Sequence, residues 1–140
     1  MASVPETEGR PLLLVDDDAP FRQRLSVLLA RKGFAVTSVG SLQEARVEAA
    51  RLKPAHAVVD MRLEDGNGLD LVAELRAMSP DVRVVMLTGY GNLATAVAAV
   101  KAGAIDYLAK PADPEDIVRA LSADGGARPE APPEPMSADR

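Results

Sequence analysis

Short apolar runs alternate along the chain with longer segments of helical periodicity, and this alternation predicts repeated βα units. Most of the apolar runs are continuous, which is typical of parallel strands that are covered by helices on both faces. The second and fifth runs are the weaker ones. The expected strands are residues 12–16, 35–39, 56–60, 83–87 and 105–109.

The segments between these strands carry apolar residues at helical spacing and signals at their ends. Asp18 and Ser41 are expected to cap the first and second helices, and a third helix is expected between Gly68 and Pro80. The fourth segment, "NLATAVAAVKAG", is almost all alanine and valine, and the fifth is "DPEDIVRALSA". Because an alanine-rich face buries little area, we expect the fourth helix to be the least firmly docked.

Composition limits the possible functions. The chain has 140 residues, of which 47% are hydrophobic, and this fits one globular domain with its own core. It has no cysteine and a single histidine, His56, which excludes disulfides, thiol nucleophiles and cysteine or histidine metal cages. The formal net charge of −5 favours a cation or a basic partner over nucleic acid. With no recognisable membrane segment or secretory signal, we expect a cytoplasmic protein.

The two ends of the chain differ from its middle. Residues 1–10 are expected to be disordered, and residues 123–140 have the proline and glycine content of a linker. A linker that leads nowhere favours the interpretation that a second domain is absent from this chain, with a natural disordered tail as the alternative.

Residues that can carry chemistry follow several of the expected strands. Asp16 and Asp17 close the first strand and Asp60 the third, while Thr88 follows the fourth and Lys110 the fifth. Ligands of open parallel sheets bind beyond the carboxyl ends of the strands, so we expect these five side chains to converge on one pocket. The adjacent aspartates would repel each other there, and a bound cation would relieve the repulsion.

The same residues suit phosphoryl transfer. Mg²⁺ prefers oxygen ligands, which Asp16, Asp17 and Asp60 can supply, and an ionised Asp60 can attack phosphorus. Phosphoryl transfer depends mostly on positioning and charge neutralisation, for which Thr88 offers a hydroxyl and Lys110 an ammonium group. The expected product is an aspartyl phosphate held by Mg²⁺, Thr88 and Lys110.

Four motifs carry a resemblance to a known family. In order and spacing, "LVDDD", "AVVDMRLEDGNGLDL", "VVMLTGYG" and "DYLAKPAD" resemble the receiver domain of two-component response regulators, over roughly residues 11–122. The resemblance implies a flavodoxin-like, doubly wound α/β fold with five parallel strands in the order 2-1-3-4-5. It also implies these roles: Asp60 as phosphoacceptor, Asp16, Asp17, Asp60 and the backbone carbonyl of Arg62 as metal ligands, Thr88 and Tyr107 as switch residues, Lys110 as phosphate-binding lysine and Pro111 as a cis-proline candidate.

A narrower resemblance is carried by "DMRLEDGNGLDL", "LTGYGNLATAVAAVKAGAIDYLAKPAD" and the tail "PPEPMSADR", which are similar to the RegA/PrrA/ActR group of redox-responsive regulators. It implies a sensor histidine kinase as partner. It further implies a homodimer that forms on phosphorylation through the fourth helix, fifth strand and fifth helix. DNA would be bound only through a C-terminal helix-turn-helix domain that is missing here.

Some residues depart from the family pattern or have a plainer interpretation. Glu64 and Asp65 stand where many receivers have proline and a hydrophobic residue, and they would add negative charge near the pocket mouth. The sequence leaves open whether this charge changes metal affinity or the lifetime of the phosphoryl group, and in which direction. Gly89 stands where alanine is commoner, which would loosen the following loop. His56 is expected to be structural. For Tyr107 the switch role is favoured, with simple core packing on the fifth strand as the alternative.

Three other functions compete with a phosphorylation switch. A Mg²⁺-dependent phosphatase would carry a second acid two residues after its nucleophile, whereas Arg62 stands there, so we expect only slow self-dephosphorylation rather than an enzyme. A flavin phosphate would be repelled by three aspartates in the first βα turn. A pseudo-receiver that binds protein without phosphorylation stays open as the alternative.

Overall fold

The computed structural model describes residues 10–89, 93–104, 106–110 and 112–122, and over these ranges strands and helices alternate as expected. The strands are β1 (Arg10–Val15), β2 (Phe34–Val39), β3 (His56–Asp60), β4 (Arg62–Leu63), β5 (Gly66–Asn67), β6 (Arg83–Thr88) and β7 (Asp106–Ala109). The helices are α1 (Ala19–Arg31), α2 (Leu42–Leu52), α3 (Gly68–Met78), α4 (Leu93–Ala102) and α5 (Pro114–Ser122). Pro111 and the expected linker lie outside the described residues.

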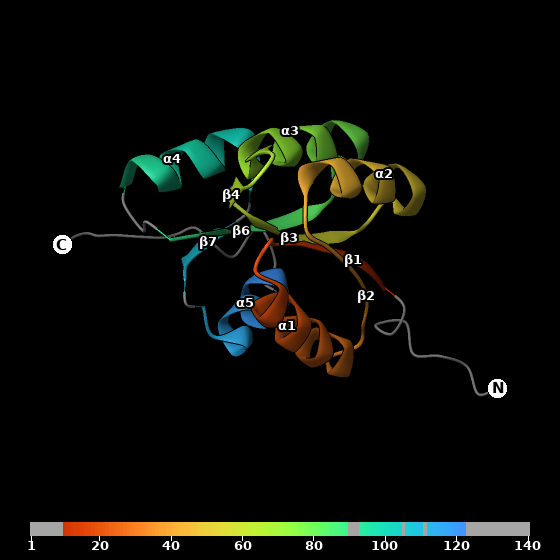
Figure 1. Ribbon diagram of the computed structural model, residues 1–140. Helices are drawn as coiled ribbons and strands as arrows, with labels where there is room; N and C mark the ends of the chain where they lie inside the picture. The colour runs from red at the N-terminus through yellow and green to blue at the C-terminus, as the bar shows by residue number, and fades with distance from the viewer. Residues whose placement is uncertain (1–9, 90–92, 105, 111, 123–140) are drawn as a thin grey trace.

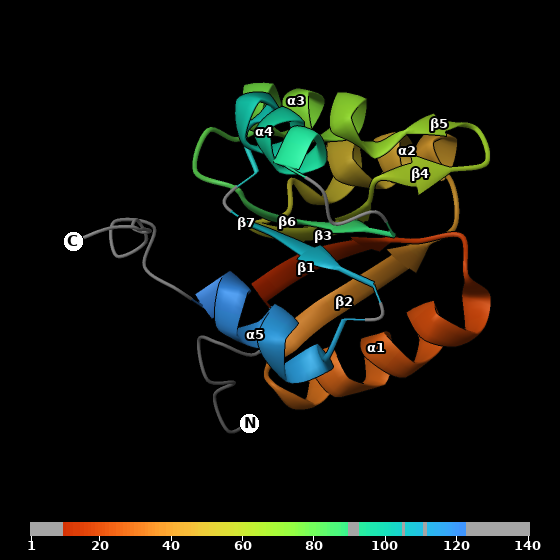
Figure 2. The same ribbon diagram turned by 90° about the vertical axis from the view of Figure 1, so that its left-hand side faces the viewer.

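Five strands form one parallel sheet in the order β2-β1-β3-β6-β7 (Figures 1 and 2). Counted along the chain without the short β4 and β5, this is the order 2-1-3-4-5 that the family resemblance implied, and the predicted fold class is confirmed. β1 begins two residues earlier than expected because Arg10 pairs with Phe34, and it ends at Val15. Asp16 therefore lies just beyond the strand, where the sheet opens to ligands.

Helices cover both faces of the sheet. α2, α3 and α4 lie on one face, and α1 and α5 on the other (Figure 1). Because side chains alternate along a strand, β1 serves two cores. Leu13 and Val15 join the cluster beneath α2 and α3, whereas Leu12 and Leu14 join the cluster beneath α1 and α5. This explains the continuous apolar runs, since each central strand is buried on both sides.

The predicted helix caps are in place. Asp18 accepts a hydrogen bond from the Phe21 N–H at 3.2 Å, and Ser41 accepts one from the Glu44 N–H at 3.1 Å. Asp18 therefore serves as the N-cap of α1, as expected from its position before Pro20.

The short antiparallel hairpin formed by β4 and β5 was not predicted. Each strand has two residues, too few to show any hydrophobic period. Its one buried side chain is Leu63, and Gly66 has a φ of 152°, which a residue with a side chain rarely adopts. The hairpin connects the end of β3 to α3 and lies beside α2 (Figure 2).

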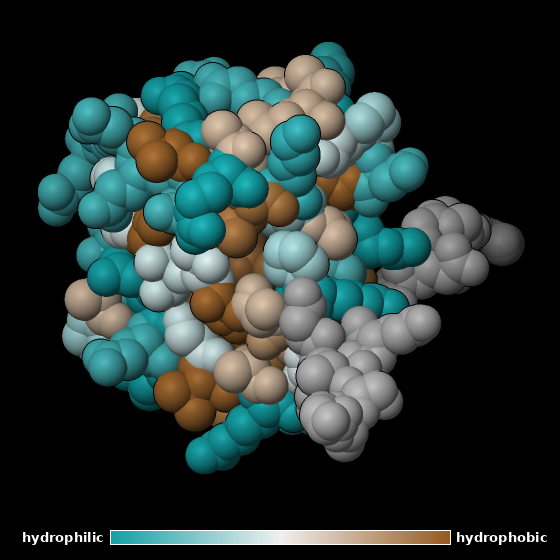
Figure 3. Space-filling model, turned by 90° about the vertical axis from the view of Figure 1, so that its right-hand side faces the viewer, coloured by the Kyte–Doolittle hydropathy of each residue, from teal (hydrophilic) through white to brown (hydrophobic). Residues whose placement is uncertain are grey.

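The surface of the described part is mixed in character. Figure 3 looks onto the side of the molecule at the right of Figure 1, where apolar and polar side chains are interspersed. On α4, Ala99 is buried while Val97 and Val100 are 43% and 62% exposed. The weak docking expected of α4 stays a prediction. Within the described ranges, every helix is too short or too polar to cross a bilayer.

Candidate functional site

Three carboxylates meet at the carboxyl edge of the sheet. Val15 of β1 pairs with Val59 of β3, so the residues that follow them, Asp16 and Asp60, lie side by side. One oxygen from each of Asp16, Asp17 and Asp60 can be chosen so that all three lie within 4.8 Å of one another. Asp16 is fully buried and Asp60 is 6% exposed. The structure thus brings together the three acids that the sequence assigned to one pocket.

Asp16 is held by its neighbours in the first βα turn. Its Oδ1 accepts a hydrogen bond from the Asp18 N–H at 2.9 Å, and its own N–H donates to the Val39 carbonyl at 3.2 Å. The Arg22 guanidinium of α1 donates to the Asp16 carbonyl at 2.5 Å. These contacts fix the Asp16 carboxylate toward the pocket.

Lys110 reaches both buried acids from the end of β7. Its Nζ lies 2.9 Å from Asp16 Oδ2 and 3.4 Å from Asp60 Oδ2. The same ammonium lies 5.2 Å from the centre of the Phe21 ring, within the range of a cation–π contact. The Lys110 N–H donates to the Thr88 carbonyl at 2.7 Å, which ties the end of β7 to the end of β6.

The buried charges change the protonation of the site. Burial and, to a smaller extent, the nearby charge of Asp16 raise the pKa of Asp60 to about 6, although Lys110 and the Arg62 N–H oppose the shift. Burial by itself lowers the pKa of Lys110, but its hydrogen bond to Asp16 and the charges of Asp60 and Asp16 outweigh this, so the pKa is raised. The single ammonium of Lys110 therefore does not offset the burial of Asp60 and the charge of Asp16, and Lys110 itself stays protonated.

Thr88 and Tyr107 lie on the two strands beyond β3. Thr88 ends β6 and is 1% exposed, one residue after Leu87, the register partner of Asp60. Tyr107 is the register partner of Met86 and packs, half-buried, against the cluster beneath α2 and α3. Thr88 is thus placed at the pocket, whereas Tyr107 lies further back along the sheet.

The backbone after Asp60 is fixed at several points. The Arg62 N–H donates to Asp60 Oδ1 at 3.4 Å. The Met61 N–H donates to the Leu87 carbonyl at 2.8 Å, and the Met61 carbonyl accepts from the Gly68 N–H at 2.7 Å. Arg62, whose carbonyl the resemblance assigned to the metal, therefore lies beside the phosphoacceptor candidate. Pro111, the cis-proline candidate, lies outside the described residues.

The acid cluster suits a hard divalent cation. All of its donor atoms are carboxylate oxygens, the ligands that Mg²⁺ and Ca²⁺ prefer. Asp16 Oδ2 is buried and is paired with the Lys110 ammonium at 2.9 Å. A carboxylate offers about four lone-pair sites, so the acids of the cluster can bind a cation in addition to the Lys110 ammonium.

Two residues of the site region were missed from the sequence. Arg22 was given no role, because nothing local indicates that a helix arginine folds back onto the Asp16 carbonyl. Asp65 was expected near the pocket mouth, but its carboxylate accepts hydrogen bonds from the Leu42 and Gln43 N–H groups of α2. Its partners are more than 20 positions away in the chain, and no sequence signal marks such a contact.

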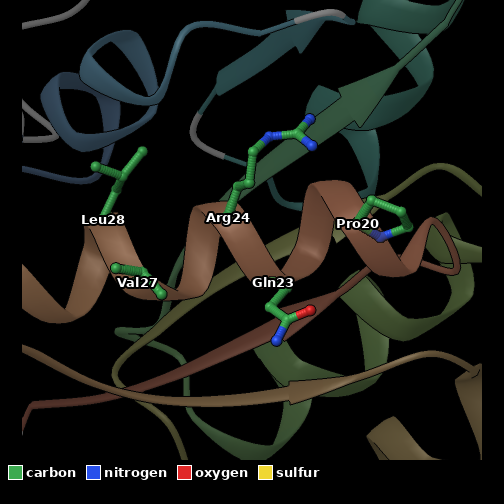
Figure 4. Close-up of a pocket in the computed structure, with 5 residues that line it drawn as sticks. All are labelled: Pro20, Gln23, Arg24, Val27 and Leu28. Atoms are coloured by element: carbon green, nitrogen blue, oxygen red, sulfur yellow. The ribbon is translucent and has the colours of Figure 1, made fainter.

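A separate hollow of about 550 Å³ lies on the outer side of α1 (Figure 4). It is lined by Pro20, Gln23, Arg24, Val27 and Leu28. Val27 is 48% exposed. Pro20 belongs to the first turn of α1, which Asp18 caps, and the hollow shares no residue with the acid cluster.

The fold and this site define a class of protein. Residues 12–122 match the family model of the response regulator receiver domain. Among solved structures, a response regulator protein from Burkholderia pseudomallei, with a phosphorylated aspartic acid, calcium ion and citrate, is 41% identical with a TM-score of 0.78. That alignment covers 84% of this chain and 69% of the other. The chain therefore belongs to the receiver domains of response regulators.

The narrower resemblance to the RegA/PrrA/ActR group is also confirmed. The photosynthetic apparatus regulatory protein RegA of Cereibacter sphaeroides is 56% identical over 94% of this chain and 71% of its own length. The acid tolerance regulatory protein ActR of Rhizobium meliloti is 52% identical over 94% of this chain and 68% of its own length. With such relatives, and with its acid set present, the chain gives no support to the pseudo-receiver alternative.

Proposed function

We propose that Asp60 accepts a phosphoryl group from the phosphohistidine of a sensor histidine kinase, with Mg²⁺ held by Asp16, Asp17, Asp60 and the Arg62 carbonyl. The observation that carries this proposal is the meeting of three carboxylates and Lys110 at the edge of the sheet. Mg²⁺ would supply charge neutralisation for the phosphoryl oxygens when bound.

In the transfer step, a carboxylate oxygen of Asp60 forms a bond to phosphorus as the bond between phosphorus and the donor imidazole nitrogen breaks. The imidazole nitrogen keeps the electron pair. Water later attacks phosphorus and releases inorganic phosphate and the free Asp60 carboxylate, which is slow self-dephosphorylation and not turnover of an external substrate. A donor protein that reaches Asp60 would pass over the first turn of α1, beside its outer hollow.

The other pocket residues would respond to the new charge. Lys110 Nζ, which now lies near Asp16 and Asp60, would bind a phosphoryl oxygen. The Thr88 hydroxyl would donate to another, and Tyr107 would change its packing against the α2 and α3 side of the sheet. This is a local charge event that biases a two-state element.

The output would be a change in the surface formed by α4, β7 and α5, through which two copies would associate. Exposed Val97 and Val100 on α4 give this surface apolar character. In a longer protein, the homodimer would pair two C-terminal helix-turn-helix domains on DNA. The redox response and the cytoplasmic location follow from likeness to the RegA/PrrA/ActR group and from the kinase as donor.

The test uses acetyl phosphate as donor. The purified chain is incubated with acetyl phosphate and Mg²⁺, and its intact mass is measured for the wild type, Asp60→Asn and Asp70→Asn. Asp70 is an exposed acid in the first turn of α3 and serves as the matched control. We expect one phosphoryl adduct in the wild type and in Asp70→Asn, and none in Asp60→Asn or with chelated Mg²⁺.

An adduct that persists in Asp60→Asn, or that forms equally without any divalent cation, would contradict the proposal. Multiple turnover of a small phosphate ester by the unmodified chain would instead favour the phosphatase alternative.

A further inference from the structure

Asp65 connects two elements that are far apart in the sequence. Its Oδ1 accepts a hydrogen bond from the Leu42 N–H at 2.9 Å, and its Oδ2 accepts one from the Gln43 N–H at 3.1 Å. These backbone hydrogen bonds hold the pKa of Asp65 below its ordinary value. The carboxylate is thus bound to the N-terminus of α2, although its residue lies in the β4–β5 turn.

The first turn of α2 needs this carboxylate. The cap residue Ser41 accepts from the Glu44 N–H through its hydroxyl at 3.1 Å and from the Ala45 N–H through its carbonyl at 3.0 Å. The N–H groups of Leu42 and Gln43, which a helix cannot satisfy internally, are left to Asp65. The helix cap is therefore shared between a local residue and the hairpin.

The hairpin is tied to the pocket at its other end. Arg62, in β4, donates to Asp60 Oδ1 at 3.4 Å. A Cβ placed on Gly68, just after β5, would lie 2.2 Å from the Asp60 carbonyl oxygen, so the two backbones are in close contact. A Cβ placed on Gly66 would lie 2.5 Å from Leu42 Cδ1, so the turn also presses on α2. The hairpin is held between Asp60 and α2.

We propose that Asp65 is a positioning residue: by fixing the β4–β5 hairpin to the N-terminus of α2, it holds the backbone at Arg62 in place and raises the affinity of the acid cluster for a divalent cation. This inference rests on the proposed function, since it concerns the same cation site. It gives a structural role to Asp65, one of the two residues that depart from the family pattern after Arg62.

The test measures Mg²⁺ affinity by isothermal titration calorimetry on the full 140-residue chain. Asp65→Ala removes both hydrogen bonds to α2, and Asp65→Asn keeps one acceptor oxygen. Glu64→Gln removes a charge from the adjacent exposed position and controls for a simple electrostatic effect. Ser41→Ala weakens the same helix end without touching the hairpin, and so controls for destabilisation of α2. Thermal unfolding in EDTA checks that each variant is folded.

We expect the Kd for Mg²⁺ to rise about tenfold in Asp65→Ala, as for the loss of outer-shell partners of metal sites, and by a smaller factor in Asp65→Asn. Glu64→Gln and Ser41→Ala should bind Mg²⁺ within about twofold of the wild type, even where Ser41→Ala lowers the Tm.

Unchanged affinity in folded Asp65→Ala would overturn the inference and leave the proposed function intact. If Asp65→Ala does not fold, unchanged affinity in Asp65→Asn would do the same. An equal loss in Glu64→Gln would assign the effect to charge alone, and an equal loss in Ser41→Ala would assign it to α2 stability. A wild-type chain that does not bind Mg²⁺ would overturn both the inference and the proposed function.

Discussion

Strand β3 carries a buried ionisable side chain at each end. The two make the free energy of unfolding change with pH in opposite directions. Asp60 ends the strand at the pocket, where its pKa is raised to about 6. His56 begins the strand, stacked edge to face on Phe34 at a centroid distance of 5.1 Å, and burial and the charges of Arg10 and Arg83 lower its pKa to about 4. The fold disfavours the charged form of both groups.

Asp60→Asn should stabilise the chain in the absence of divalent cations. Because the folded pKa of Asp60 lies above its unfolded value, the cost of its charge is fully present above about pH 6 and disappears as the pH falls toward 4. Urea unfolding in EDTA at pH 8 should show a gain of roughly 2 kcal/mol, after allowance for the partner that Lys110 loses. The gain should shrink by about half at pH 5. A destabilised variant would contradict this account of the pocket.

His56→Leu should remove a pH dependence of the opposite sign. A neutral buried histidine supports the fold above pH 6.5, and this support is lost between pH 6.5 and about 4 as the unfolded chain takes up a proton. Between pH 7.5 and pH 5 the wild type should lose about 2 kcal/mol relative to His56→Leu. Denaturation curves of both proteins at the two pH values measure this, and parallel pH profiles would show that His56 does not titrate as described.

At the scale of elements, the β4–β5 hairpin and the start of α3 lie in close contact with the backbone at Asp60. Gly68→Ala should disturb it, because the new Cβ would lie 2.2 Å from the Asp60 carbonyl oxygen and 2.8 Å from Val59 Cγ1. The overpacking should cost roughly 1–3 kcal/mol in the free energy of unfolding and lower the rate of acetyl phosphate labelling. Gly89→Ala is the matched control, since its Cβ would meet nothing within 4 Å. Equal behaviour of the two variants would argue against close packing at Gly68.

The elements that the sequence predicted are those with enough residues to show a period or a cap. The apolar runs of β1, β3 and β6 are continuous because both faces are buried, and α1 and α2 carry their own caps in Asp18 and Ser41. The β4–β5 hairpin has two residues in each strand, which is too short to show a hydrophobic period or a cap. Asp65 was missed for a related reason, because its partners on α2 are brought near only by the tertiary fold.

At the scale of the whole molecule, the position of the site could be predicted because the sheet is parallel. Asp16, Asp60 and Lys110 are far apart in sequence, yet the rule that ligands meet the carboxyl ends of strands was sufficient to place them together. The rule does not give side-chain partners. It could not indicate that Lys110 lies closer to Asp16 than to Asp60, or that Arg22 holds the Asp16 carbonyl.

Binding of a divalent cation should stabilise the whole domain by mass action. With Mg²⁺ at a hundred times its Kd, the free energy of unfolding should rise by about 2.7 kcal/mol. Thermal unfolding with Mg²⁺ and with NaCl at equal ionic strength separates specific binding from screening. The increase in Tm should be absent in Asp16→Asn, which removes one buried carboxylate charge from the cluster. An equal increase in both proteins would place the stabilising cation elsewhere.

The ammonium of Lys110, shared between Asp16 and Asp60, gives the acid cluster a counterion that belongs to the chain itself. A cluster that relied on an external cation for neutrality would tie the folding of the domain to the supply of that cation. Here the Lys110 ammonium neutralises part of the negative charge of the cluster, so we expect the domain to stay folded when metal is scarce. Because the same ammonium is paired with two carboxylates of the cluster, an incoming cation has to share those oxygens with the lysine or displace it.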